Sequence, residues 1–94
     1  MFDWDTSKAA ANLAKHGVSF EEASTVFADP KALDGPDLGH SAQEARFLRL
    51  GRSALEDVLM VAYTLRRSGD VEKIRIISAR LASRKERAAY RGSA

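Results

Sequence analysis

The sequence predicts an α+β fold, in which two N-terminal helices pack against an antiparallel sheet of about four strands and a third helix follows. Three observations support this prediction. Apolar residues have helical spacing before residue 30, they alternate with a period of two between residues 31 and 79, and a new helix start stands at Ser83. The chain has 94 residues, of which 45% are apolar. We therefore expect a single domain over residues 1–94.

The first helix has a recognisable start and end. Residues 2–4 form a short extended start, and Asp5 is a suitable N-cap because its carboxylate can accept a hydrogen bond from an amide of the first turn. The helix is expected to run through Lys15. Gly17 then ends it, since glycine readily adopts the left-handed conformation that stops a helix. His16 therefore lies at a helix-ending corner.

The second helix and the last helix carry the same start signal. Ser19 with Glu22, and Ser83 with Glu86, have the spacing of a capping box, in which each side chain accepts from the other residue's amide. The second helix is expected to stop before the Asp-Pro pair at residues 29–30. Its apolar residues share one face, which we expect to lie on the sheet: Phe20, Ala23, Val26 and Phe27.

Alternating apolar residues predict strands at about 31–34, 46–50, 58–65 and 71–79. Segments rich in glycine, proline, serine and aspartate separate these strands and predict turns between them. Residues 58–63 are apolar on both faces, which is typical of a central strand.

The charges are unevenly distributed along the chain. Residues 1–45 carry three cations and eight acids, whereas residues 46–94 carry twelve cations and five acids. From Arg75 to Arg91 there are six cationic side chains and a single acid, Glu86. Such a segment indicates a polyanionic ligand. The alternative is that the arginine-rich and glutamate-rich surfaces are simply solvated.

Several classes of protein are excluded or disfavoured. Cysteine is absent, which excludes disulfides, thiolate metal sites and a cysteine nucleophile. No apolar stretch approaches the roughly 20 residues of a spanning helix, so we expect a cytoplasmic protein without membrane contact. The sequence has no metal-binding spacing and no glycine-rich phosphate loop, so we expect neither a metal nor another cofactor. A Ser/His/Asp hydrolase stays open, although no Gly-x-Ser-x-Gly motif is present.

The two histidines are candidate proton-transfer residues in different settings. His16 follows Lys15, and a cationic neighbour favours the neutral, proton-accepting form of an imidazole. His16 can equally be a helix C-terminal residue that is stabilised by the macrodipole. His40 lies in a glycine-containing loop, where an ordinary surface position is the simpler interpretation.

A cation-rich site with one histidine suits phosphodiester chemistry on RNA. The substrate supplies its own nucleophile, the 2′-hydroxyl. The protein must then deprotonate this hydroxyl, align the reacting oxygens, stabilise the phosphorane and protonate the 5′-oxygen. Arg80, at a strand end, is the leading candidate for charge stabilisation, unless it pairs with an acid of the N-terminal half. Arg66 is a second candidate clamp. Tyr90 could stack on a base or donate a proton, although anchoring of the last helix to the sheet is the simpler interpretation.

Together these residues resemble a known family. The Lys-His-Gly-Val-Ser-Phe-Glu-Glu-Ala block at residues 15–23 and the Ile-Ile-Ser-Ala-Arg block at 76–80 are specific in combination. Further matching blocks lie at residues 2–5, 26–30, 46–47, 50–53, 63–64 and 86–90. Over nearly its whole length the chain resembles the BrnT toxins of type II toxin–antitoxin modules.

The resemblance implies a RelE-like fold and a metal-independent endoribonuclease that stops growth by cutting RNA. It also implies neutralisation by a BrnA-like antitoxin, with operator DNA contacted only through the toxin–antitoxin complex. An alternative function is that of a non-catalytic nucleic-acid-binding subunit, or a degenerate toxin, that acts in operon autoregulation. A third is a purely structural protein whose basic face binds an acidic partner.

The matching motifs supply the candidate site. We expect His16, Arg66 and Arg80 to be catalytic. We expect four further residues to bind substrate: Lys15, Ser78, Arg84 and Tyr90. The segment at 65–73 is longer than expected for the family, which leaves open whether Arg66 or Arg67 is the clamp.

Overall fold

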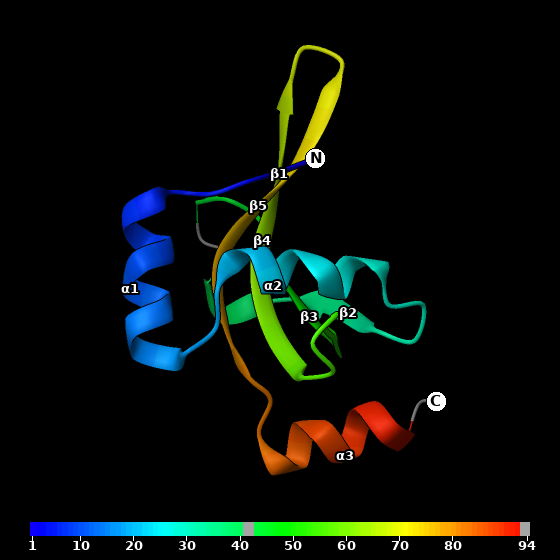
Figure 1. Ribbon diagram of the computed structural model, residues 1–94. Helices are drawn as coiled ribbons and strands as arrows, with labels where there is room; N and C mark the ends of the chain where they lie inside the picture. Colours follow the sequence, from blue (N-terminus) through cyan, green and yellow to red (C-terminus); the bar gives the residue numbers. More distant parts are fainter. Residues whose placement is uncertain (41–42, 93–94) are drawn as a thin grey trace.

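The computed structural model describes residues 1–40 and 43–92, and within them one five-stranded sheet has the order β1-β5-β4-β3-β2 (Figure 1). The strands are β1 (Phe2–Asp3), β2 (Leu33–Pro36), β3 (Phe47–Arg52), β4 (Val58–Ser68) and β5 (Val71–Leu81). The helices are α1 (Thr6–His16), α2 (Phe20–Ser24) and α3 (Arg84–Gly92), with 3₁₀ turns η1 (Thr25–Ala28) and η2 (Leu38–His40). The predicted α+β fold is confirmed. No helix in the described stretches is long and apolar enough to cross a membrane.

The strand predicted to be central, β4, lies in the middle of the sheet between its antiparallel neighbours β3 and β5. A fifth strand adds to the four that alternation indicated. β1 pairs in parallel with β5, with Phe2 opposite Ile74 and the Ile74 amide donating to the Met1 carbonyl at 2.8 Å. The sheet is therefore mixed. Two residues are too few to show an alternating pattern, so the sequence indicated only an extended start here.

The main core lies between one face of the sheet and the N-terminal helices. Trp4 packs edge-to-face on the buried Phe20, with ring centroids 5.9 Å apart. A fully buried aliphatic or aromatic side chain contributes about 1.5–3 kcal/mol relative to an exposed one. The buried cluster consists of Val18, Phe20, Ala23, Val26, Leu59, Val61, Ile76 and Ala79.

An irregularity in β5 sets which side chains face this core. Between two consecutive residues of β4, the partner on β5 changes from Ser78 to Ile76, so Ile77 is an extra, bulged residue. Ile76 and Ala79 are three residues apart, yet both are buried in the core. Because alternation resumes after the bulge, Ser78 and Arg80 lie on the opposite face.

The predicted ends of α1 are confirmed. Asp5 accepts a hydrogen bond from the Lys8 amide at 3.0 Å. Gly17 adopts a left-handed conformation with φ of 70° and donates its amide to the Leu13 carbonyl at 2.9 Å. The terminating glycine thereby fixes where the chain leaves the helix.

The two predicted capping boxes differ. At α3 both halves form, because the Glu86 amide donates to Ser83 Oγ at 3.1 Å and the Ser83 amide donates to Glu86 Oε1 at 2.8 Å. At α2 the Glu22 amide donates to Ser19 Oγ at 2.9 Å. The predicted return bond is wrong, because the Glu22 carboxylate instead accepts from the Ser53 hydroxyl at 2.7 Å. The contact with Ser53, which is distant in sequence, therefore replaces the predicted bond to the Ser19 amide.

Asn12 joins α1 to the free edge of β5. Its Nδ2 donates to the Ala79 carbonyl at 2.8 Å, and its Oδ1 accepts from the Ala79 amide at 3.1 Å. Nδ2 also donates to the Val18 carbonyl at 3.0 Å. β1 pairs with β5 only at residues 74–75, so the Asn12 amide supplies the backbone-like partner that Ala79 otherwise lacks.

α3 covers one end of the second sheet face. Tyr90 is buried there with Leu50 and Ala82. Its hydroxyl donates to Asp29 Oδ2 at 2.6 Å, and the Arg52 guanidinium lies 5.8 Å from its ring centroid. Tyr90 therefore anchors the last helix to the sheet, as the simplest interpretation of the sequence predicted.

The β4–β5 hairpin projects beyond the rest of the sheet (Figure 1). Pairing with β3 ends at Tyr63, and pairing with β1 involves only Ile74 and Arg75. Residues 65–73 are exposed, and their two strands pair with each other. Arg66 lies opposite Lys73 in this arm.

The Asn12 bonds lead to a stability prediction. Asn12→Leu leaves the amide and carbonyl of Ala79 without their partner, and an unsatisfied buried polar group costs about 1–3 kcal/mol. We expect the free energy of unfolding, measured by urea denaturation, to fall by about 2–3 kcal/mol. Leu13→Ala is the control, because this neighbouring side chain is 51% exposed and its loss should change stability by less than about 0.5 kcal/mol. Equal stability of the two variants would contradict the role of Asn12.

Candidate functional site

A cavity of about 530 Å³ opens on the second face of the sheet, beside the part that α3 covers. Five elements contribute to its wall: the C-terminal end of α1, the η2 region, the start of β3, the first half of β4 and the C-terminal end of β5. The lining residues are Lys15, His16, Asp37, His40, Arg46, Leu48, Met60, Ala62, Ser78, Ala79 and Arg80.

The floor of this cavity follows from strand pairing. Met60 lies opposite Arg80, and Ala62 lies opposite Ser78. Leu48 on β3 pairs with Ala62. Alternation places these side chains on one face. The floor is thus apolar in β3 and β4, whereas β5 contributes a hydroxyl and a guanidinium.

The end of α1 brings Lys15 and His16 to the rim. Asn12 lies one helical turn earlier, so its bonds to β5 hold this end of the helix against the strand that carries Ser78. His16 is half-buried and Lys15 is exposed. The helix-ending corner predicted from Gly17 is therefore a wall of the cavity.

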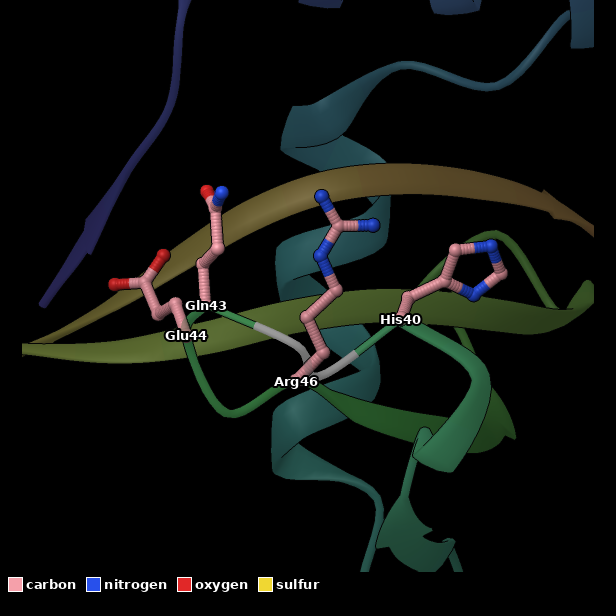
Figure 2. A pocket seen from close by; sticks show the side chains of 4 residues that line it. All are labelled: His40, Gln43, Glu44 and Arg46. Carbon is pink, nitrogen blue, oxygen red and sulfur yellow. The ribbon is translucent and has the colours of Figure 1, made fainter.

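Asp37, His40 and Arg46 also line the cavity, although the sequence analysis did not select them for the candidate site. His40 Nδ1 lies 3.2 and 3.1 Å from the two carboxylate oxygens of Asp37. A smaller cavity of about 280 Å³ adjoins them, lined by His40, Gln43, Glu44 and Arg46, and Figure 2 shows the Arg46 and His40 side chains extending to the same side. The available signal was the Asp-x-x-His spacing in a turn, which allows the carboxylate to orient the imidazole.

Arg80 is held by Glu86 at the rim of the cavity. Its Nη1 donates to Glu86 Oε1 at 2.7 Å, and its Nη2 donates to Oε2 at 2.9 Å. These bonds lower the pKa of Glu86 to about 2 and raise the pKa of Arg80. The partner of Arg80 is therefore an acid of α3 and not one of the N-terminal half.

Four of the predicted site residues meet at this cavity: Lys15, His16, Ser78 and Arg80. Arg66 does not. Met60 on β4 pairs with Arg80, and Arg66 lies six residues further along the same strand. At about 3.3 Å per residue, this separation is roughly 20 Å. The Arg66 Nε lies 3.2 Å from Glu44 Oε2.

The remaining candidates also lie outside the cavity lining. Arg84 is exposed in the first turn of α3, and Tyr90 is buried beneath that helix. Arg67 follows Arg66 on the strand, so alternation directs it to the other face of the sheet. Of the two arginines, Arg66 is thus the one on the same face as Ser78 and Arg80.

No cluster of three or more His, Cys, Asp or Glu side chains that could hold a metal ion occurs within residues 1–40 and 43–92. The donors that line the cavity include two imidazoles and a single carboxylate, that of Asp37.

Comparison with known proteins identifies the class. Residues 4–86 match the family model described as the ribonuclease toxin BrnT of type II toxin–antitoxin systems. The fold is similar to the crystal structure of the Brucella abortus ribonuclease toxin BrnT, with a TM-score of 0.64 and 26% sequence identity. That match covers 89% of this chain and 99% of the Brucella chain. No curated protein sequence matches this chain.

The protein is therefore a ribonuclease toxin of a type II toxin–antitoxin system. More particularly, the chain belongs to the BrnT family, as the motif resemblance implied.

The Arg80–Glu86 pair predicts a pH dependence of stability. The pKa of Glu86 in the folded protein, about 2, lies below its ordinary value of 4.5. The pair therefore stabilises the fold fully above the ordinary value, and this contribution is lost as the pH falls from 4.5 towards 2. In urea denaturation, we expect Glu86→Gln to be less stable than the parent near pH 7, with the difference shrinking below about pH 4.5. A difference that is independent of pH would contradict the pairing.

Proposed function

We propose that this toxin cleaves RNA without a metal ion, by attack of the 2′-hydroxyl on the adjacent phosphate, in the cavity on the second face of the sheet, which the end of α1 borders. The observation that carries this proposal is the convergence of both histidines and three cations on one cavity: Lys15, His16, His40, Arg46 and Arg80. Proton transfer and charge stabilisation are the two requirements of this reaction, and these side chains provide both.

The histidines divide the proton transfers. One imidazole accepts the 2′-hydroxyl proton while the other, protonated, donates to the 5′-oxygen that leaves. His16 is assigned as the base, because the helix-ending corner before Gly17 places its half-buried side chain in the wall of the cavity. His40 is assigned as the acid, because the Asp37 carboxylate, 3.1 Å from its Nδ1, orients the imidazole at the cavity.

The cations hold the phosphate and stabilise its developing charge. Arg80 is assigned to the phosphorane, since a guanidinium can bond two phosphate oxygens at once. Lys15 and the Ser78 hydroxyl are assigned to neighbouring groups of the RNA backbone. Tyr90 supports the site indirectly by anchoring α3. Arg66, in the projecting arm, lies too far away for a catalytic role and is reassigned to RNA outside the cavity.

Arg84 and Lys85 support binding to a polyanion. Both are exposed and lie in the first turn of α3, where the helix macrodipole disfavours cations. A placement that weakens the helix is explained by contact with RNA or with an acidic segment of the antitoxin.

The test of this function is cleavage of RNA by the purified toxin in the presence of a chelator. We expect fragments with 2′,3′-cyclic phosphate ends, and we expect folded Arg80→Ala to lose about a hundredfold or more in kcat. Arg67→Ala is the matched control, since it removes an exposed arginine on the other sheet face. RNA binding without cleavage by the parent would identify a non-catalytic subunit, and near-parental cleavage by Arg80→Ala would remove Arg80 from the mechanism.

The proton-transfer roles predict the pH profile of cleavage. With one imidazole as base and one as acid, kcat should follow a bell between about pH 5 and 8. His16→Gln should lower kcat and abolish the limb that rises with pH, whereas His40→Gln should abolish the falling limb. An active His16→Gln protein with the parental profile would reject the base assignment, and a changed melting temperature alone would indicate a structural histidine.

We further propose that a BrnA-like antitoxin neutralises the toxin by covering α3 and the rim of the cavity, and that operator DNA is contacted only through that complex. Charge complementarity would then accelerate association and make it sensitive to salt. Reversing Arg84 and Lys85 to Glu should slow association at low salt by about tenfold or more without destabilising the toxin, since acids suit a helix N-terminus. Unchanged association kinetics and salt dependence would place the antitoxin elsewhere.

A further inference from the structure

We infer that Glu86 is a positioning residue for the cleavage reaction, which acts by holding one edge of the Arg80 guanidinium so that the other edge is presented to the phosphate. This inference rests on the proposed function. No motif or comparison assigns Glu86 such a role, and the capping box alone accounts for its presence in sequence terms.

The hydrogen-bond inventory of Arg80 indicates an oriented guanidinium. Of its five N–H groups, Nη1 uses one for Glu86 Oε1 and one for the Leu81 carbonyl at 3.3 Å, and Nη2 uses one for Glu86 Oε2. Two groups remain after these bonds to described residues: Nε–H and the second Nη2–H. They point in the same direction along one edge of the planar group, which is the spacing that two phosphate oxygens accept.

Holding the guanidinium matters because burial alone does not fix the Arg80 side chain. Its side chain is 44% exposed, whereas that of Glu86 is 26% exposed. An unrestrained arginine samples many rotamers and must lose this freedom at the moment of reaction. A partner that fixes the guanidinium beforehand places the positive charge where negative charge develops, which favours the transition state over the ground state.

The carboxylate is itself restrained. Glu86 Oε1 accepts from the Ser83 backbone amide at 2.8 Å, a bond that does not involve the Ser83 side chain. α3 is in turn fixed to the sheet by the buried Tyr90. The orientation of Arg80 is thereby linked to the seating of the last helix.

The capping box offers a matched control. Ser83→Ala removes the hydroxyl that caps α3 but leaves the Glu86 carboxylate with both of its bonds to Arg80. Glu86→Gln retains an acceptor for the Ser83 amide but removes the charge and one of the two oxygens that hold Arg80. Both variants should lower the melting temperature, so a purely structural role predicts the same kinetic result for both.

We expect Glu86→Gln to lower kcat by about 10- to 100-fold with KM changed by less than about threefold, because misorientation of a charge stabiliser acts on the transition state. Ser83→Ala should keep the parental kcat. In the Arg80→Ala background, Glu86→Gln should have no further effect on kcat, because its action passes through Arg80. NMR gives a readout without substrate. Rotation about the Cζ–Nη bonds of Arg80 should be slow in the parent and fast in Glu86→Gln.

The outcomes separate the inference from the proposed function. If Arg80→Ala abolishes cleavage but Glu86→Gln has the parental kcat, the positioning role is wrong and the catalytic assignment of Arg80 stands. Equal losses in Ser83→Ala and Glu86→Gln, or additive losses in the double variant, would also overturn it. If Arg80→Ala cleaves normally, the proposed function of Arg80 fails, and fast rotation of its Nη groups in the parent would then reject the oriented guanidinium as well.

Discussion

The bond between the Asn12 side chain and the Ala79 backbone is the constraint on which the cavity depends. β5 has a neighbouring strand on its outer edge only at residues 74–75, and further along the side-chain amide of Asn12 takes that place. A primary amide matches a peptide group in donor and acceptor, so it can satisfy a strand edge without a strand. The last turn of α1 is thereby held beside Ser78, and Lys15 and His16 gain fixed positions.

The two faces of the sheet are covered to different extents. One face is closed by the N-terminal helices over a continuous apolar core. On the other, α3 covers only the end around Leu50, where the Tyr90–Asp29 bond at 2.6 Å holds it. The floor at Leu48 and Ala62 is left beneath the cavity. A helix of nine residues is too short to cover the whole face, and the surface it leaves open is the one bordered by histidines and cations.

The elements could be predicted from the sequence because their signals are local: caps, terminating glycine and alternation. The residues of the candidate site could be brought together from the sequence only in part. Lys15, His16, Ser78 and Arg80 meet as expected, but the association of His40 and Arg46 with them depends on long-range pairing that no local pattern encodes. Part of the charge asymmetry along the sequence is neutralised by ion pairs within the folded chain. Three arginines of the C-terminal half pair with acids of the N-terminal half, in the pairs Arg49–Asp34, Arg66–Glu44 and Arg75–Asp3. These ion pairs connect the basic C-terminal half of the chain to its acidic N-terminal half.

The extra residue at Ile77 has a consequence for how this family is to be compared. Before the bulge, even-numbered positions of β5 face the core, and after it odd-numbered positions do. Arg75 and Arg80 therefore share a face although a simple count separates them. Because Ile77 is the extra residue, a relative without the bulge would have one residue fewer here and would keep its equivalents of Ser78 and Ala79 on the same faces. Alignments that move a gap by one position in β5 would thus equate core residues of one toxin with surface residues of another.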